Sequence, residues 1–545
     1  RGRLIAKLKE AAPGTRERAL YDEFETAKRT AEASSLLARV EAEDGGRFPL
    51  TGRGDVNTYA LFAELFATLA STRGRAGVIV PTGIATDATT APFFAELVGN
   101  KRLAQLIDFE NRERIFPAID SRIKFSLLTV GQEVTQSNFA FFLTDARQMA
   151  EPERRFTLSA ADIARINPNT KTAPVFRSRA DRELTAKTYA RVPVLIDESK
   201  GKGGNPWGAA FHTRIWHMAE DSQWFRTTAQ LSAAGFVRDG AEWTVQTGLR
   251  PRQSALALFG GRDSRSLPLH GGTMGDYPER YVPLYEAKMI HQFDHRWATY
   301  EDNEAREVSV AEKSQFTFEP EPRYWVPERE VSKRLREVNW SKKWLLGWRE
   351  TTNATNERSL ITNVIPAVAC GHKFPLMFPD AEPQLCAALL GSMNSIACDF
   401  AVRQKIGGTS LSLSLLKQFA IISSHTYTPN DLRFILPRVL ELTYSSHSLA
   451  PFARDLGYHG PPFAWDDDRR AQLRAELDAW YARAYGVTRD ELRYILDPAD
   501  VKGPDYPSET FRVLKKNEIA RFGEYRTAKL VLQAWDRLQQ GDLAG

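Results

Sequence analysis

Three apolar runs of strand length lie between residues 77 and 130. They read GVIVP (77–81), LAQLIDF (103–109) and IKFSLLTV (123–130). A helical pattern, APFFAELVGNKRL, separates the first run from the second, and the charged loop ENRERIFPAIDSR separates the second from the third. This order of strand, helix, strand, loop and strand, joined by short connections, predicts an α/β sheet.

Helical patterns flank this stretch. Residues 1–45 predict a charged helix that is broken at Ala12-Pro13-Gly14. The segment NTYALFAELFATLA (57–70) has helical spacing of its large apolar side chains. The positions that share one face are Tyr59, Phe62, Leu65, Phe66 and Leu69.

The later chain mixes both patterns. NFAFFL (138–143) predicts a strand, and Thr157, Ser159 and Asp162 mark the start of a helix at ADIARI. A long apolar helix is expected over 385–402, and the tail from Trp465 predicts further helices. An aromatic cluster has two interpretations, a base-stacking platform or, more often, ordinary core. Its members are Trp207, Phe211, Trp216, Trp224 and Phe225.

Composition limits the class of protein. The length of 545 residues predicts two or three domains, and 42% apolar with 26% charged residues is ordinary for a globular protein. No run approaches the ~20 apolar residues of a membrane span, and the charged N-terminus does not resemble a signal peptide. Three cysteines without a C-x-x-C pair predict no disulfide framework or zinc cluster, which suits the cytoplasm. The net charge of +5 is compatible with a polyanionic partner.

Three segments together carry a family resemblance: GRGDVNTY (52–59), GRAGVIVP (74–81) and DFENRERIFPAIDSRIKF (108–125). In this order they resemble the C-terminal half of the catalytic domain of adenine-specific DNA methyltransferases. The similar enzymes belong to large fused restriction–modification and phage-defence systems of the DISARM-like, BREX-like and type IIG-like kinds. The alternative is an arbitrary α/β domain.

Two later segments extend the resemblance. PLYEAKMIHQFDHRWATY (283–300) resembles the opening of a target-recognition domain, with Ala287 where glycine is usual. The segment 385–422, with Gly407 and Gly408 at its turn, resembles the helix–Gly-Gly–strand part that closes the recognition domains of type I specificity subunits.

The resemblance implies an α/β fold: a partial Rossmann-like methyltransferase sheet, then an α+β target-recognition domain with a helical C-terminal tail. The domains expected are a catalytic half with a helical arm (1–150), a middle region (151–275), a recognition domain (276–460) and a helical region (461–545). A glycine-rich loop at 264–276 is the first candidate boundary.

The implied activity is methyl transfer from S-adenosyl-L-methionine to the exocyclic amine of an adenine flipped out of the duplex. The implied partners are double-stranded DNA and other subunits of restriction or defence systems, without a membrane.

The resemblance also implies site residues. Asp55, Asn57 and Phe125 are the catalytic candidates, with Phe125 placed either against the flipped base or in the core. Pro81, Thr82 and Gly83 are the cofactor candidates, because ligands of open sheets bind at the carboxyl ends of strands.

The candidate DNA contacts are donors suited to phosphates and base edges. They are Arg122, Lys124, Lys288, His291, Gln292, His295, Arg296, Arg403 and Lys405. Arg403 and Lys405 have a second interpretation, as cations that complement a helix C-terminus. His291 and His295 have a metal-like i, i+4 spacing, but no third ligand is apparent, so no metal site is predicted.

Two elements of the family pattern are missing from this sequence. Adenine methylation uses an [N/D]-P-P-[Y/F/W] loop, and the nearest segments, INPNT (166–170) and GNPWG (204–208), predict turns. The glycine-rich cofactor loop is missing too. The leading interpretation is therefore the C-terminal portion of a DNA adenine methyltransferase. The alternative is a non-catalytic DNA-binding or specificity module that acts with a separate catalytic subunit.

Overall fold

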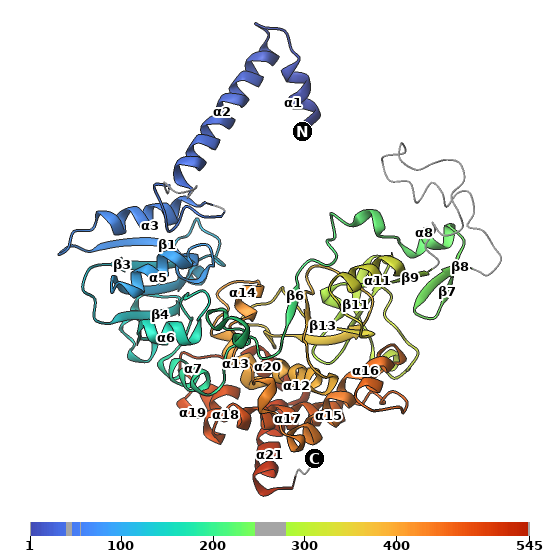
Figure 1. Ribbon diagram of the computed structural model, residues 1–545. Helices are drawn as coiled ribbons and strands as arrows, with labels where there is room; N and C mark the ends of the chain where they lie inside the picture. Colours follow the sequence, from blue (N-terminus) through green and yellow to red (C-terminus); the bar gives the residue numbers. More distant parts are fainter. Residues whose placement is uncertain (1, 40–45, 55, 246–279, 543–545) are drawn as a thin grey trace. The chain divides into compact units, whose positions relative to one another are not determined.

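The computed structural model describes residues 2–39, 46–54, 56–245 and 280–542. The chain forms two compact units, unit 1 over 1–182 and unit 2 over 183–545 (Figure 1). The catalytic candidate Asp55 and the candidate boundary at 264–276 lie outside the described residues. The division into four domains stays a prediction, whereas the described chain separates at 182/183.

Unit 1 combines a mixed sheet with short helices and a helical arm. Its helices are α1 (Gly2–Lys9), α2 (Arg16–Ala38), α3 (Thr58–Leu69), α4 (Gly83–Thr86), α5 (Ala91–Gly99) and α6 (Ala160–Ile166), and α7 (Arg179–Arg191) continues into unit 2. Its strands are β1 (Ala76–Pro81), β2 (Leu103–Glu110), β3 (Lys124–Val130), β4 (Ser137–Leu143) and β5 (Phe156–Leu158). The predicted helices before residue 70 and the predicted strands are confirmed.

The strand order of this sheet is β1-β3-β2-β4-β5. Strand β3 runs antiparallel to both β1 and β2, while β2 and β4 are parallel. The carboxyl ends of β1, β2 and β4 therefore meet the amino end of β3 at one edge, which we call the carboxyl edge. The hairpin of β2 and β3 is confirmed, and a Rossmann-like arrangement stays a prediction.

Local sequence signals explain several boundaries in unit 1. Ser159 caps α6 by accepting a hydrogen bond from the Asp162 N–H, and the Asp162 side chain accepts one from the Ser159 N–H in return. This capping box satisfies two amide groups that the first helical turn leaves without partners. The helix start predicted at ADIARI is confirmed.

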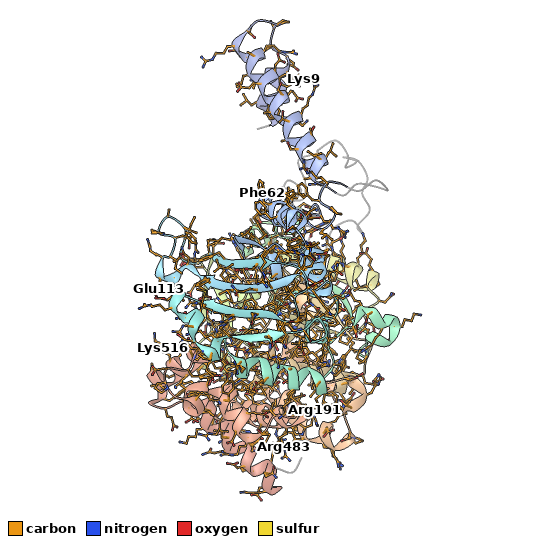
Figure 2. The ribbon with its side chains drawn as sticks, turned by 90° about the vertical axis from the view of Figure 1, so that its left-hand side faces the viewer. Lys9, Phe62, Glu113, Arg191, Arg483 and Lys516 are labelled. Carbon is orange, nitrogen blue, oxygen red and sulfur yellow. The ribbon has the colours of Figure 1, made fainter. Side chains whose placement is uncertain are left out.

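Helix α3 forms as predicted but buries its small side chains, Ala60, Ala63 and Ala67. Small residues allow close packing against the neighbouring strand β1. Phe62 is 55% exposed and Leu69 is 70% exposed. Four large apolar side chains of α3 and of the edge strand β1 are exposed, Phe62, Phe66, Leu69 and Ile79, and we call them together the outer apolar face; Figure 2 labels Phe62.

Unit 2 contains two larger sheets, a hairpin and a helical C-terminal region. Its strands are β6 (Ala210–His212), β7 (Phe236–Asp239), β8 (Glu242–Val245), β9 (Arg280–Tyr285), β10 (Ala298–Glu301), β11 (Glu304–Glu307), β12 (Trp325–Pro327), β13 (Trp344–Trp348), β14 (Thr362–Pro366), β15 (Ala369–Cys370) and β16 (Leu376–Phe378). One sheet has the order β12-β9-β8-β7, with β15 beside β9, and another has the order β14-β13-β16-β6. Strands β10 and β11 form the hairpin.

The helices of unit 2 cluster toward its C-terminal end, so the predicted helical tail is confirmed (Figure 1). They are α8 (Thr228–Ala233), α10 (Val310–Lys313), α11 (Glu328–Glu337), α12 (Pro383–Asn394), α13 (Ile396–Arg403), α14 (Leu413–Leu416), α15 (Pro429–Thr443), α16 (Ala450–Asp455), α17 (Asp467–Ala484), α18 (Arg489–Leu496), α19 (Pro498–Lys502), α20 (Arg512–Phe522) and α21 (Arg526–Gln540).

The single helix predicted over 385–402 is instead two helices, α12 and α13, bent by 56°. Ser395 has extended backbone and caps α13 by accepting a hydrogen bond from the Cys398 N–H. Within the described ranges no single helix is long and apolar enough to cross a membrane, although α12 and α13 have that length and composition together. Residues 386–403 of the pair are buried in the fold.

The remaining predictions concern turns and aromatic side chains. In GNPWG, the Asn205 side chain closes a turn through two hydrogen bonds of 3.0 Å with the backbone of Ala209.

Trp207 and Trp216 are each 1% exposed, and Phe225 is 7% exposed. These three aromatic residues therefore belong to the core and do not form an exposed platform for base stacking.

Candidate functional site

The carboxyl edge of unit 1 brings together polar groups from four neighbouring strands. Asp108 near the end of β2 is 1% exposed. Its Oδ1 accepts hydrogen bonds from the Thr82 hydroxyl, which follows β1, and from the Ser126 hydroxyl of β3 at 3.1 Å. Its Oδ2 accepts a hydrogen bond from the Phe142 N–H of β4 at 3.3 Å. One carboxylate therefore joins β1, β2, β3 and β4 where the strands end.

Burial raises the pKa of the Asp108 carboxyl group to about 6. The Thr82 hydrogen bond and the positive charge of Lys124 oppose this increase, as do the Phe142 and Ser126 donors. Burial therefore outweighs four stabilising contacts, and the carboxyl group changes protonation close to neutral pH. Shifted pKa values of this kind are concentrated at functional sites, although structural networks show them too.

Phe142 has an unusual backbone conformation beside Asp108, with φ at +62°. The left-handed region costs a non-glycine residue about 1 kcal/mol or more. Two cations lie against the Phe142 ring, with Lys124 Nζ at 4.5 Å and the Arg177 guanidinium at 4.0 Å from the ring centre. Lys124 also lies 3.3 Å from the Glu110 carboxylate. These contacts hold the strained residue in place.

The loop over 111–123, which joins β2 to β3, extends from the same edge; Figure 2 labels Glu113 on it. The fully buried Asn111 side chain fixes the loop by donating to the carbonyl groups of Phe116 and Ile119 and accepting from the Phe116 N–H, each at 2.9 Å. Outside this anchor the loop is exposed. Its exposed apolar and basic side chains are Arg112, Arg114, Ile115, Phe116, Ile119, Arg122 and Ile123.

Two of the three catalytic candidates, Asn57 and Phe125, lie within the described residues, and neither contacts the Asp108 carboxylate in a hydrogen bond. Asn57 is exposed at the N-cap of α3, where its side chain makes no capping hydrogen bond. Phe125 is 9% exposed and stacks on Phe109 at 5.3 Å, while the edge of Phe116 approaches at 4.9 Å. Of the two placements expected for Phe125, against the flipped base or in the core, the structure has the one in the core.

The cofactor candidates fit S-adenosyl-L-methionine only in part. Thr82 is 7% exposed and its hydroxyl is already bound to Asp108. A side chain at Gly83 would meet the Asp87 carboxylate at 2.3 Å and the Tyr59 hydroxyl at 3.2 Å, so the space beside Gly83 is filled by the protein itself. Pro81 is the exposed member of the three. We therefore assign no cofactor contact to the Thr82 hydroxyl.

The candidate DNA contacts in unit 1 are accessible to different degrees. The Arg122 side chain is 87% exposed and pairs with Asp120 at 2.8 Å. The Lys124 side chain is 22% exposed, because Glu110 and the Phe142 ring enclose it. Arg122 is accessible but already paired with Asp120, whereas Lys124 supports the carboxyl edge.

Four candidate DNA contacts in unit 2 are buried and hold backbone segments together. Arg296 is 0% exposed and donates to four carbonyl groups at 2.8–3.1 Å. His295 contacts Ser446 at 3.0 Å, and burial followed by the charge of Arg296 lowers the pKa of its imidazole to about 3.

Arg403 donates to four carbonyl groups and to the Asp399 carboxylate. Lys405 donates to the Gln418 carbonyl, and burial lowers the pKa of its amine well below the usual value. At these four positions the geometry favours a structural role over contact with DNA, because the donor groups are used inside the fold.

The other three unit 2 candidates differ from one another. Lys288 is exposed, with its amine 4.7 Å from the centre of the Tyr300 ring. Gln292 is buried and donates to the Leu360 carbonyl at 2.7 Å. His291 lies against Trp297, with 4.5 Å between ring centres, and lines a pocket that is partly open to solvent. Lys288 is therefore the accessible cation among the three.

Sequence reasoning missed Asp108, Ser126 and Phe142. Asp108 had a usable signal, since it is the one charged residue in the apolar run LAQLIDF. A carboxylate on a fully buried strand needs partners. Ser126 and Phe142 had no comparable signal, because their roles depend on the pairing of β2 with β3 and β4.

No protein-family model and no curated protein matches the chain. Among solved structures, the chain is similar to the type IIG restriction endonuclease BpuSI, with 12% sequence identity, a TM-score of 0.24, and 81% of this chain and 51% of BpuSI covered. It is also similar to the type IIL restriction-modification enzyme MmeI in complex with DNA, with 11% identity, a TM-score of 0.33, and 86% and 52% covered. The chain spans about half the length of these structures. A likeness of this size carries no argument about the site.

Proposed function

We propose that this chain is the C-terminal portion of a site-specific DNA adenine methyltransferase of a restriction–modification or phage-defence system. The observation that carries the proposal is that the segments with the family resemblance lie next to one another in the sheet of unit 1. GRAGVIVP becomes β1, and the segment 108–125 becomes the end of β2, the exposed loop and the start of β3. Because β3 lies between β1 and β2, segments separated in sequence form one continuous structure.

In this proposal Asp108 is a positioning residue. It is too deeply buried to touch DNA, but it fixes the relative positions of Thr82, Ser126 and Phe142. The exposed loop anchored by Asn111 is then presented rigidly, with both basic and apolar side chains. Cations suit DNA phosphates, and an exposed aromatic ring can stack on a base that has left the duplex.

S-adenosyl-L-methionine is proposed as the methyl donor, and it would supply the electrophilic methyl group. The glycine-rich loop and the N-P-P-type loop that the family uses are not in this sequence. Their contribution is proposed to come from another part of the same polypeptide or from a partner. The residues of this chain would position the DNA and complete the sheet.

The test is transfer of tritiated methyl groups from S-adenosyl-L-methionine to bacterial DNA, followed by digestion to nucleosides. This chain is compared with a version extended upstream. A third protein is the extended version with Thr82→Val, a nearly isosteric change that removes the hydrogen bond to Asp108. The matched control is Thr157→Val on β5, which is half-buried in the same sheet. We expect label in N6-methyladenine for the extended protein, and less label for Thr82→Val than for the control.

Two other outcomes would replace this proposal. Duplex DNA binding without methylation by either version would favour the specificity module that acts with a separate catalytic subunit. Absence of both methylation and DNA binding would show that the resemblance does not extend to function.

A further inference from the structure

Unit 2 contains a pocket of about 500 Å³ that is partly open to solvent and that the proposed function does not use; we call it the cavity. The volume lies within the range of small-molecule sites, about 300–1,000 Å³. Its walls come from the segment after β9, from α17 and from α20. The residues that matter below are His291, Trp297, Arg358, Trp465, Arg470 and Arg474.

The main carboxylates of the cavity wall are already bound to protein donors. Asp294 accepts from the Lys313 amine at 2.7 Å and from the Arg296 N–H at 2.9 Å. Asp478 accepts from the Ile396 N–H at 2.7 Å and from Arg358 Nη2 at 3.2 Å.

Most of the remaining carboxylates of the wall also accept hydrogen bonds from groups of the protein. The Glu518 carboxylate accepts from the N–H and the hydroxyl of Thr527 at 2.7 and 2.6 Å. Asp467 accepts from the Trp465 indole N–H at 2.9 Å and pairs with Arg521 at 3.3 Å. Glu357 accepts from the Asn517 amide, and Glu307 is exposed. Each of these carboxylates except Glu307 therefore has a donor from the fold, and Asp294, Asp467 and Asp478 are each paired with a cation.

Two arginine side chains of the wall have unused donors. The Arg358 side chain is 10% exposed, and its buried Nη1 has no hydrogen-bond partner among the described residues. Arg474 forms no hydrogen bond or ion pair with any residue in the described ranges, although it is accessible from the cavity that it lines. Arg470 differs, because it donates to the Leu442 and Phe293 carbonyl groups. The buried Nη1 of Arg358 is costly to leave without a partner and favours an anionic acceptor, while the exposed Arg474 guanidinium is open to the same ligand.

The electrostatics of the cavity agree with this geometry. Burial lowers the pKa of the His291 imidazole to about 3, with further contributions from Arg349, Arg474 and Arg358. His291 is therefore neutral at physiological pH, so one ring nitrogen carries a proton and the other accepts.

The aromatic walls are already covered. Trp465 has the Arg470 guanidinium 3.7 Å and the Lys313 amine 4.5 Å from its ring centre. Trp297 contacts His291 at 4.5 Å and Lys313 at 5.0 Å. These rings leave little face for stacking a base, so an anionic group is the part of a ligand that the cavity is suited to recognise.

We propose that this cavity binds the phosphate group of a small molecule through the guanidinium groups of Arg358 and Arg474, with His291 as a neutral hydrogen-bonding partner. Two guanidinium groups match the several terminal oxygens of a phosphate better than the two oxygens of a carboxylate. The phosphate is either inorganic phosphate or the terminal group of a mononucleotide. The inference is independent of methyl transfer.

The test is a calorimetric titration of the whole chain with inorganic phosphate and, separately, with adenosine monophosphate, at constant ionic strength. Acetate serves as the carboxylate comparison. Tryptophan fluorescence gives a second readout, since Trp297 and Trp465 line the cavity. The variants are Arg474→Gln and Arg474→Lys. The matched control is Arg483→Gln, an exposed arginine near the end of the same helix, outside the cavity and labelled in Figure 2.

We expect phosphate to bind the original chain and Arg483→Gln equally, and to bind Arg474→Gln about 10- to 100-fold more weakly because charge-assisted hydrogen bonds are lost. Arg474→Lys keeps the charge without the planar fork, so its affinity should lie between the two. Tighter binding of the mononucleotide than of phosphate would identify a nucleotide as the ligand, and equal binding would identify free phosphate. An original chain that does not bind phosphate, acetate that binds as well as phosphate, or unchanged affinity in both Arg474 variants would overturn the proposal.

Discussion

Buried cations in unit 2 are satisfied mainly by backbone carbonyl groups, and Arg296 is the clearest case. Its four acceptors include the carbonyl group of Ser445, which lies 149 residues away in the sequence. The segment around Arg296 suggested a surface for DNA because donors and aromatic residues alternate in it. The acceptors could not be found from sequence, since they are backbone atoms of distant segments whose position depends on the complete fold.

Replacing Arg296 by methionine should therefore destabilise unit 2. The change removes the donor from four carbonyl groups, two of them in buried hydrogen bonds, and we expect a loss of about 3 kcal/mol or more in the free energy of unfolding. All twelve tryptophans lie in unit 2, so denaturation followed by tryptophan fluorescence measures this unit. The exposed Arg323, replaced by methionine, is the control and should change stability by less than about 0.5 kcal/mol. Equal effects of the two changes would contradict the structural role of Arg296.

Asp108 gives a prediction about pH. Its pKa is about 6 in the folded protein and 3.8 in the reference state, so the folded protein binds the proton more tightly between these values. Stability from this group is therefore present at low pH and is lost as the pH rises through 6. Between pH 7 and pH 5 the gain should be about 1 kcal/mol.

The measurement is chemical denaturation of unit 1 at both pH values, followed by far-ultraviolet circular dichroism, for the original chain and for Asp108→Asn. Other groups titrate alike in the two proteins, so the difference between them isolates Asp108. A pH dependence that Asp108→Asn leaves unchanged would show that the carboxyl group does not titrate in this range.

At the scale of elements, the sequence predicts the strands of unit 1 and the C-terminal helices well, because apolar periodicity and capping residues are local signals. It fails at α12 and α13. Ser395 looks like an ordinary residue within a long apolar run, and its role as a cap depends on the backbone bend. The neighbouring Asn394 also binds Thr362 of β14, which is a long-range contact that no periodicity contains.

The loop between β2 and β3 leads to a prediction about Asn111. Asn111→Ala removes three hydrogen bonds that hold the loop at Phe116 and Ile119. We expect faster hydrogen exchange of the Phe116 amide and, if the loop meets DNA, weaker binding of duplex DNA by about tenfold. Asn100→Ala is the control, since Asn100 makes one exposed side-chain hydrogen bond to Glu96. Unchanged exchange at Phe116 would mean that the loop is held by other contacts.

At the scale of the whole molecule, the sequence predicts several domains, and the described chain forms two compact units. The position of their division was not predicted, because α7 carries no break in its helical pattern at residue 182. Charge and cysteine content carry no information about this division, which depends on contacts between distant segments.

The outer apolar face of unit 1 should make the chain associate with itself. Exposed clusters of large apolar side chains favour association, and β1 offers unpaired backbone groups at the end of its sheet. We expect the sedimentation coefficient to rise with protein concentration, and Phe62→Lys together with Ile79→Lys to suppress the rise. The pair Ile115→Lys and Ile119→Lys, on the exposed loop, is the control for added charge. Equal suppression by both pairs would assign the effect to net charge.

This face also has a practical consequence for anyone preparing the protein. A sample would lose monodispersity during concentration well before any unfolding, since the side chains responsible are already exposed in the native fold. Because apolar association weakens on cooling, storage in the cold at low concentration should preserve such a sample better than added salt, which strengthens the same contacts.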